Sequence, residues 1–432
     1  MSSQAPAGWI RTDLGSITNE EGDRVGSAPP PVVLSSTKHH GLVPSGEFFK
    51  GRTIYSADLS NYKSVHRDWF AYATNHLAEG SVGLQARFAT ACVSPIYTVF
   101  SCRDSVDPSF LFRVLKVPAT IAAFQIYEQA SVDRRGAVRY RDFAKVSIDL
   151  PPRSEQRRIA EILDTVDDAI RSTENIIAKL GLMKLGLLHD LLTRGTDEGG
   201  TLRASSGSED GFVDTQLGRL PAGWLVDRLG AHLIAIEAGH SPDVPDRPAS
   251  PGEWGVLKVS AVRPDGFQSN ENKAVTERAL IDPKDEVHNG DVLITRANTP
   301  QLVGLACVVT GGPQRLLLSD KTLRLIVNGA TAYPEYACLL LQSPIARAQI
   351  EVNGTGSSGS MKNISQQEIR DLLLPWPSLA EQRRICERSH AIADRIAEGA
   401  IGLGKLRQLK QGLIEDLLTG RVRTAVDDKD AA

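Results

Sequence analysis

The chain contains two copies of one sequence pattern, and this duplication constrains its fold more than any other feature. The motif Glu-Gln-Arg-Arg-Ile at residues 155–159 recurs at residues 381–385, an offset of 226 residues. The offset holds without a gap to residue 193, and 17 of the 39 aligned pairs between residues 155 and 193 are identical. Self-similarity of this kind is the signature of a tandem repeat and predicts two structurally similar halves.

A second repeated motif lies upstream of the first in each copy. Pro-Ala-Gly-Trp at residues 6–9 reappears at residues 221–224, an offset of 215, and Leu-Gly begins five residues after the tryptophan both times. The two offsets differ by 11 residues, so the interior of the second copy is longer by about that number. The predicted order is a globular segment, a helical segment, and then the same pair again.

Each helical segment carries apolar residues at alternating steps of three and four. These positions are Ile159, Leu163, Val166, Ile170, Ile177, Leu180, Leu187 and Leu191 in the first segment, and Ile385, Ile392, Ile396, Leu403, Leu406, Leu413 and Leu417 in the second. Such heptads predict two long helices, each roughly 60 Å at 1.5 Å per residue, that pair as an antiparallel coiled coil. The alternative is that each apolar stripe packs only on its own globular segment.

The globular segments contain short β-type runs separated by Gly, Pro and Asn, such as residues 291–294 and 322–327, with short helices expected at 334–341 and 344–350. This mixture predicts an α+β fold for each segment. The predicted boundaries are 1–150 for the first globular domain, 151–195 for the first long helix, 196–219 for a flexible linker, 220–375 for the second globular domain, 376–424 for the second long helix and 425–432 for a disordered tail.

Composition narrows the class of protein. The five cysteines are dispersed without metal-ligand spacing, which is typical of reduced thiols in a cytoplasmic protein. We find no stretch of signal-peptide type and no apolar run long enough to cross a membrane. Motifs of nucleotide hydrolases, zinc proteases, serine hydrolases and amino-methyltransferases are absent, which favours a binding subunit over an enzyme.

Two specific functions stay open at this point. Asp265, Glu271 and Lys273 have the spacing of a metal-dependent nuclease motif, although a solvated hairpin loop explains them as well. The chain could also be a coiled-coil adaptor with no DNA role. Its net charge of −3 at pH 7, taken alone, disfavours a nucleic-acid partner.

These motifs together resemble a known family, the specificity (S) subunits of type I restriction–modification systems. The resemblance covers nearly the whole chain. It rests on the two Pro-x-x-x-Glu-Gln-Arg-Arg-Ile segments, the Leu-Leu-Thr helix ends, the Pro-Ala-Gly-Trp openings and the stretches 290–296 and 354–375. One departure is that the first copy lacks the Gly-x-Ser-Pro stretch found at residues 239–242.

The resemblance implies that each globular segment is a target-recognition domain that reads one half of a bipartite, asymmetric site in double-stranded DNA. The helices would set the spacing and dock two modification (methyltransferase) subunits, and restriction (motor-nuclease) subunits would join the complex. This chain would hold no metal or cofactor and would not be catalytic. S-adenosylmethionine, ATP and Mg are expected on the partner subunits.

Charge is distributed unevenly between the two domains. Residues 50–145 contain 13 Lys and Arg against 8 Asp and Glu, whereas residues 224–375 contain 14 against 17. Basic and amide side chains in both domains are therefore candidates for contact with phosphates or base edges. The candidates are Arg52, Lys63, Arg67, Arg87, Arg103, Arg134, Arg135 and Arg139 in the first domain, and Lys258, Arg263, Arg296, Asn298, Gln301, Lys321, Lys362 and Asn363 in the second.

The repeated helix-start motifs are the candidates for helix packing and partner docking. Their residues are Glu155, Gln156, Arg157, Arg158 and Ile159 in the first copy, and Glu381, Gln382, Arg383, Arg384 and Ile385 in the second. A glutamate in the first turn suits the helix dipole. We expect the isoleucines to point inward and both arginine pairs to stay exposed, facing a partner.

Overall fold

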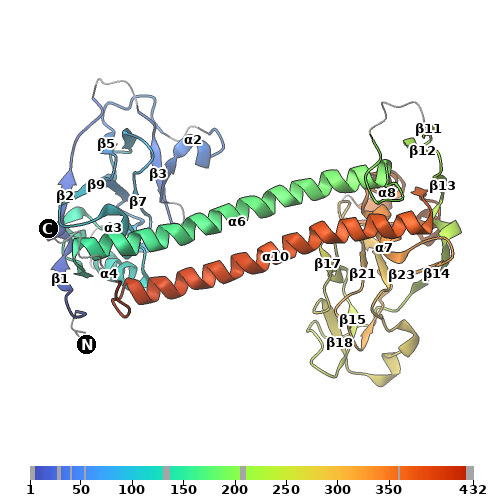
Figure 1. Ribbon diagram of the computed structural model, residues 1–432. Helices are drawn as coiled ribbons and strands as arrows, with labels where there is room; N and C mark the ends of the chain where they lie inside the picture. The colour runs from blue at the N-terminus through green and yellow to red at the C-terminus, as the bar shows by residue number, and fades with distance from the viewer. Residues whose placement is uncertain are drawn as a thin grey trace. The chain divides into compact units, whose positions relative to one another are not determined.

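The structure is a computed structural model of the chain. It describes residues 5–26, 31–38, 41–52, 55–129, 137–204, 211–358 and 361–424. The chain divides into two compact units, one formed by residues 1–175 with 401–432 and the other by residues 176–400 (Figure 1). Because both divisions fall inside long helices, each unit holds one globular domain and one end of each long helix.

The first unit contains the N-terminal domain. Its elements are β1 (Ile10–Asp13), α1 (Leu14–Ile17), β2 (Thr18–Glu21), β3 (Leu34–Thr37), β4 (Gly41–Pro44), α2 (Ser45–Phe48), β5 (Lys63–His66), β6 (Phe70–Ala73), the 3-10 helix η1 (Leu77–Glu79), β7 (Val82–Leu84), β8 (Thr90–Val93), β9 (Tyr97–Cys102), α3 (Pro108–Leu115), α4 (Pro118–Gln129), α5 (Tyr140–Phe143) and β10 (Ser147–Leu150). An antiparallel sheet of order β2-β9-β6-β7 is covered by the short helices, and Phe70, Phe100 and Phe143 fill the core between them.

The second unit contains the central domain. Its strands are β11 (Phe212–Thr215), β12 (Gly218–Pro221), β13 (Leu225–Arg228), β14 (Leu233–Ala238), β15 (Trp254–Leu257), β16 (Val262–Arg263), β17 (Gly266–Phe267), β18 (Asn272–Val275), β19 (Val292–Thr295), β20 (Ala297–Asn298), β21 (Ala306–Val308), β22 (Leu316–Leu317), β23 (Thr322–Val327), β24 (Thr355–Ser358), β25 (Met361–Asn363) and β26 (Leu373–Trp376). Its helices are η2 (Leu229–His232), η3 (Val259–Ala261), η4 (Arg278–Leu280), η5 (Pro283–Asp285), α7 (Pro334–Gln342), α8 (Pro344–Asn353) and α9 (Gln366–Arg370).

The two domains share one sheet topology. The order β14-β23-β19-β21 in the central domain repeats β2-β9-β6-β7 in the N-terminal domain, and every neighbouring pair is antiparallel in both. The helices that follow also match, because α3 and α7 begin at Pro108 and Pro334, and α4 and α8 at Pro118 and Pro344, each 226 residues apart. The duplication thus covers the whole segment between the two repeated sequence motifs of each copy.

A two-stranded ribbon joins each domain to its long helix. β1 pairs with β10 and β13 pairs with β26, both antiparallel. Close packing in this ribbon region explains the glycine of the Leu-Gly dipeptide that follows each tryptophan. A Cβ on Gly15 would lie 2.8 Å from the Cβ of Ala144, and one on Gly230 would lie 3.0 Å from the Cβ of Arg370. Only glycine lets the chain approach this closely in both domains.

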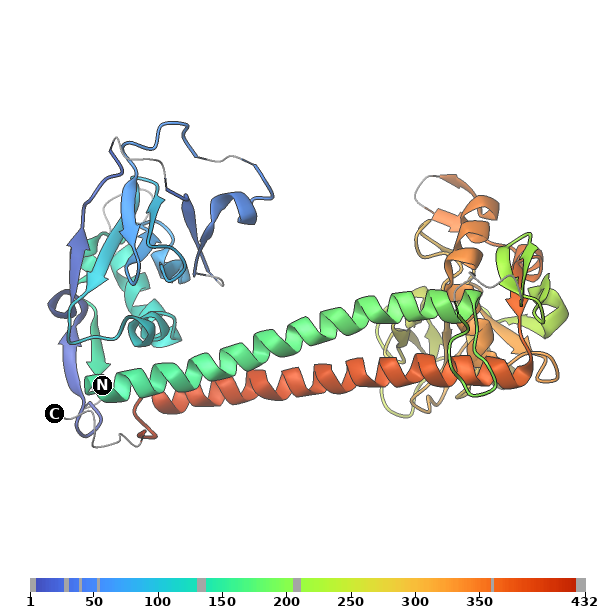
Figure 2. The same ribbon diagram turned by 45° about the horizontal axis from the view of Figure 1, so that its top comes forward.

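The two long helices are α6 (Arg153–Thr193) and α10 (Leu379–Leu417), and they lie side by side in both units (Figures 1 and 2). In the first unit, Leu163 and Leu417 share one buried core. In the second unit, Ile385 shares a core with Leu191, near the opposite end of α6. The start of one helix therefore packs on the end of the other, which confirms the predicted antiparallel pairing and the α+β fold class.

The predicted heptad positions are the less exposed positions of both helices. In α6, Ile159, Leu163 and Leu191 are fully buried, while the residues between them in the stripe are half-buried. The interruptions Thr173 and Lys184 lie on the same stripe and are also half-buried. A seam that is only half-buried in its middle agrees with a pairing of two helices and no third layer.

Part of the segment predicted as a linker is structured. Thr196 forms an isolated β-bridge with Leu202 and is fully buried, and the hairpin of β11 and β12 begins inside the range 196–219 and ends at Pro221. The Gly- and Ser-rich composition led to the expectation of an unpacked linker. The difference arises because Thr196 and Arg203 bond to the start of α10.

No single helix in the described parts of the chain is long and apolar enough to span a membrane. The helices α3 and α4 pass that length and composition test only when taken together, and they are bent by 67° at the break between them. Their apolar residues Phe110, Leu111 and Phe124 lie in the core of the N-terminal domain.

Candidate nucleic-acid interface

The first repeated glutamate forms a buried cluster with the first repeated tryptophan. In the first unit, the indole Nε1 of Trp9 donates to Glu155 Oε2 at 3.3 Å. The guanidinium of Arg423, just beyond the end of α10, donates to both carboxylate oxygens of Glu155 at 2.7 Å. Arg423 also donates to the carbonyl oxygen of Ala7. These contacts tie both ends of the described chain to the start of α6.

The second unit builds the same cluster from the second copy. Trp224 Nε1 donates to Glu381 Oε2 at 3.2 Å, and Arg203, just beyond the end of α6, donates to the same oxygen at 3.1 Å. The backbone N–H of Thr196 adds a bond of 2.8 Å to Glu381 Oε1. Arg203 and Arg423 are not aligned by the repeat, yet each supplies the guanidinium that its buried glutamate requires.

The two repeated glutamines make identical sets of hydrogen bonds. Gln156 Oε1 accepts from the N–H of Asp107 at 2.8 Å, and its Nε2 donates to the carbonyls of Ser105 and Pro151. Gln382 bonds in the same way to positions shifted by 226 residues, the N–H of Tyr333 at 2.8 Å and the carbonyls of Thr331 and Pro377. Each glutamine therefore fixes a globular domain to the start of a helix.

The arginines of the motif face outward instead. Arg157 and Arg158 are exposed, as is Arg383, whose guanidinium lies 5.8 Å from the centre of the Tyr333 ring. Arg384 is half-buried, and its Nε lies 3.4 Å from Thr196 Oγ1. Glu155, Gln156 and Ile159, and their copies Glu381, Gln382 and Ile385, are all buried.

The N-terminal domain gathers some of its predicted contacts on one side. Arg67 and Arg87 are exposed on adjoining turns, since the N–H of Arg67 bonds to the carbonyl of Ala89. Arg87 forms an ion pair of 3.1 Å with Glu47 of α2, and the exposed Arg52 follows that helix. Lys63 points inward instead, because its Nζ donates to the carbonyl of Tyr97 at 2.6 Å, and burial lowers its pKa.

The remaining candidates of this domain lie elsewhere. Arg103 follows β9 and donates to Asn19 Oδ1 at 3.1 Å. Arg139 is exposed and precedes α5. Arg134 and Arg135 lie outside the described residues.

The central domain brings five of its candidates to one edge. Strand β20 pairs with β25, which sets Ala297 opposite Asn363 and Asn298 opposite Lys362. The N–H of Arg296 bonds to the carbonyl of Lys321 at 2.8 Å, and Arg296 and Lys321 are both exposed. Arg296, Asn298, Lys321, Lys362 and Asn363 thus form one polar cluster at the end of β19. As DNA contacts they stay predictions.

Of the three other candidates of this domain, two form ion pairs with acidic side chains. Lys258 forms an ion pair of 2.7 Å with Asp246, and Arg263 one of 3.1 Å with Glu271. Gln301 is exposed in the turn after β20. In the nuclease-like triplet, Glu271 is held by Arg263 and Ser260, Lys273 lies 3.8 Å from Asp246, and Asp265 lies in the turn of the β16–β17 hairpin. The described residues contain no group of metal-ligating side chains.

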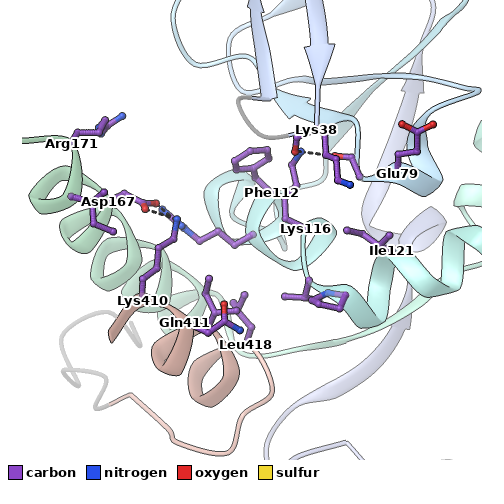
Figure 3. A pocket seen from close by; sticks show the side chains of 16 residues that line it. Lys38, Glu79, Phe112, Lys116, Ile121, Asp167, Arg171, Lys410, Gln411 and Leu418 are labelled. Carbon is purple, nitrogen blue, oxygen red and sulfur yellow. Dashed lines mark hydrogen bonds and ion pairs between the residues drawn. The ribbon is translucent and has the colours of Figure 1, made fainter. Parts of the chain in front are cut away.

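A groove of about 680 Å³ opens in the first unit between α3, α6 and the end of α10 (Figure 3). Asp167 accepts bonds there from Lys410 at 2.6 Å and from Arg113 at 2.9 Å. Burial alone would raise the pKa of Asp167, but these two cations outweigh it and the pKa lies below its usual range. On the facing side, burial lowers the pKa of Lys116 to about 8.

Comparison with known proteins shows what the chain resembles. Residues 93–182 match the model described as the type I restriction modification DNA specificity domain. The chain is 34% identical over 168 residues to the type I restriction enzyme EcoEI specificity subunit of Escherichia coli, a match that covers 38% of this chain and 28% of that subunit. The chain is therefore similar to type I restriction–modification specificity subunits, and residues 93–182 match the model of their DNA specificity domain.

Two further relatives cover more of the chain. The putative MjaX specificity subunit of Methanocaldococcus jannaschii is 24% identical over 322 residues, which are 74% of this chain and 69% of that one. The crystal structure of the type I restriction-modification S subunit from M. genitalium shares the fold, with a TM-score of 0.56, 13% identity and coverage of 96% and 97%. The EcoEI match spans less than a third of that subunit's length.

The residues that sequence reasoning missed in this chain are Arg113, Lys116, Arg203, Lys410 and Arg423. Lys410 aligns with Lys184 in the repeat, but the other four have no identical partner there, so the duplication carries no signal for them. A buried repeated glutamate does imply a cationic partner. Only the folded chain shows which arginine supplies it.

Proposed function

We propose that this chain is a specificity subunit that binds double-stranded DNA and that each recognition domain reads one half of a bipartite, asymmetric site. The observation that carries the proposal is the duplicated junction, in which Trp9 and Trp224, Glu155 and Glu381, and Gln156 and Gln382 make equivalent bonds. Two equivalent junctions that hold two domains with different outer surfaces suit a reader of two unlike half-sites.

We propose that α6 and α10 set the spacing between the half-sites and dock two modification subunits. Large apolar side chains on these helices support a docking role, because they are exposed in the described chain. They are Ile176, Leu182, Met183 and Leu185 on α6 and Ile401 and Leu409 on α10. The exposed arginines at both helix starts add positive charge to the same helices.

The chain itself is proposed to be non-catalytic. Restriction subunits would join the complex, S-adenosylmethionine, ATP and Mg would bind to the partner subunits, and the complex would act in the cytoplasm. The engagement of Glu271 by Arg263 and Ser260, and of Lys273 by Asp246, fits this division of labour. The adaptor without a DNA role stays the alternative.

The experiment is to express the chain together with the methyltransferase subunit of its host in a strain without other DNA methylation, and to sequence the methylated bases. We expect one bipartite methylated motif that disappears when the chain is omitted. Exchange of residues 1–150 for those of another specificity subunit should change one half of the motif only. Methylation that does not depend on this chain would contradict the proposal.

A further inference from the structure

The central domain contains a cavity of about 200 Å³ that is lined by lysines. No contact described so far accounts for this cluster of positive charge. Three lysines reach it from separate elements. Lys258 follows β15, Lys273 lies on β18, and Lys321 precedes β23. In the described chain Lys321 has no ion-pair partner. Three ammonium groups around one small cavity form a site for an anion with several oxygens.

The Gly-x-Ser-Pro stretch supplies another wall of this cavity. The N–H of Gly239 bonds to the carbonyl of Ser319, and a Cβ on Gly239 would lie 2.2 Å from the carbonyl oxygen of Leu318. Glycine at this position therefore allows the chain to pass close to the strand edge and brings Ser241 to the cavity beside Ser319. Ser241 is held there by Asp320.

An acidic side chain of the same domain, Asp246, already lies beside two of these lysines. Asp246 lies in the segment between β14 and β15, and its Oδ1 is 2.7 Å from Lys258 Nζ and 3.8 Å from Lys273 Nζ. The side chain of Asp246 is 69% exposed, so solvent competes for it. Its hydrogen bond from Lys258 holds its pKa below the usual value, which keeps it charged.

The N-terminal domain has no such site at the matching place. The parallel bridge Val33–Cys92 corresponds to Val256–Leu317, and β3–β4 corresponds to β15–β18. This register puts Ser35 and Ser45 where the central domain has Lys258 and Lys273, and the two serine hydroxyls bond to each other at 2.7 Å. Ile96 stands before β9 where Lys321 stands before β23.

We infer that Lys258, Lys273 and Lys321 bind one phosphate of the DNA backbone and that Asp246 occupies this site as an internal competitor until the phosphate displaces it. The inference rests on the proposed function. Contacts to phosphates position a protein on the duplex and do not carry sequence information. The central domain, with more acidic than basic residues, concentrates its attraction for DNA in one cavity, and Asp246 weakens that attraction for DNA of any sequence.

The test uses the full chain with its methyltransferase partner and a fluorescent duplex that carries the methylated motif. The variants are Lys273→Ala, Lys321→Ala, the triple alanine variant that includes Lys258, and Asp246→Asn. Lys284→Ala and Asp282→Asn are matched controls, because Lys284 and Asp282 also pair at 2.7 Å but lie outside the cavity. Thermal unfolding of every variant checks that it folds.

We expect each lysine variant to bind more weakly and to lose about one unit of slope in the plot of log affinity against log salt. Asp246→Asn should bind about two- to fivefold more tightly, since no internal ion pair must break. The control variants should match the wild type. Lysine and aspartate variants that bind like their controls would overturn the inference while the proposed function stands.

Failure of the wild-type complex to bind the duplex would instead overturn the proposed function. Inorganic phosphate is titrated in parallel by calorimetry. If phosphate binds the wild type, is lost from the triple variant, and DNA affinity does not change, the cavity is a site for free phosphate and the DNA assignment is wrong.

Discussion

The starts of α6 and α10 make the same contacts in both units, whereas the outer parts of the two recognition domains do not. Gln156 and Gln382 bond to the same three backbone positions of their domains. By contrast, the serine pair of the N-terminal domain stands where the central domain has a lysine cavity. The junctions of the duplicated halves therefore keep one set of side chains, whereas the outer parts of the two domains differ.

The largest expected effect on stability comes from removing the buried glutamate that both junctions share. Glu155→Ala should cost about 3 kcal/mol of unfolding free energy, because Arg423 and the indole of Trp9 lose their buried acceptor. Glu381→Ala should cost the same to within about 1 kcal/mol, since Arg203 and Trp224 lose theirs. Denaturant unfolding followed by tryptophan fluorescence measures both.

Glu161→Ala is the control for these variants. Glu161 is exposed and, among the described residues, pairs with Arg158, three residues before it on the same helix. Costs that differ by more than about 2 kcal/mol between the two glutamates would show that the junctions are alike in geometry but not in energy.

The next largest effect on stability concerns a buried arginine that only the central domain has at the matching position. Arg324 of β23 is almost fully buried and donates to Glu237, Asp291 and the carbonyls of Lys284 and Glu286. Arg324→Met should cost about 2 kcal/mol, because these acceptors lose their donor. The matching position of the N-terminal domain is Val99, and Val99→Met should cost less. Thermal unfolding compares the two, and equal losses would contradict this account.

The sequence predicted the parts of the fold that repeat or that follow a regular period. The heptads of α6 and α10, the strand Thr322–Val327 and the starts of α7 and α8 at Pro334 and Pro344 agree with the structure. The linker expectation differed because composition does not show that Arg203 must reach Glu381. The candidate site was predicted less well, since charge alone did not separate the inward Lys63 from the exposed Arg67.

Acidification is expected to lower stability by a smaller amount, through a contact that only the first unit has. Asp167 has a depressed pKa beside Lys410 and Arg113, whereas the repeat places Ala393 at the matching position of α10. A carboxyl whose pKa is lower in the folded state binds fewer protons there, so its stabilisation is full above the unfolded pKa and is lost as the pH falls through the folded pKa.

Asp167→Asn should therefore flatten the acid side of the stability profile. The variant and the wild type are compared by denaturant unfolding at a series of pH values below neutrality. The exposed Asp168, which pairs only with Arg171 on its own helix, is the control position. A wild-type profile that Asp167→Asn leaves unchanged at low pH would show that the three-way contact adds nothing to stability.

The smallest effect on stability, and a specific effect on assembly, is expected for the arginines that the repeat keeps exposed. Arg157→Glu combined with Arg383→Glu should change the unfolding free energy by less than about 0.5 kcal/mol, because neither guanidinium is part of a buried contact. If these arginines face the modification subunits, the double variant should elute from size-exclusion chromatography without them. The repeat kept Glu155 and Gln156 for contacts inside the chain, and no internal contact of similar strength explains Arg157. Normal assembly of the double variant would mean that these arginines do not contribute to docking.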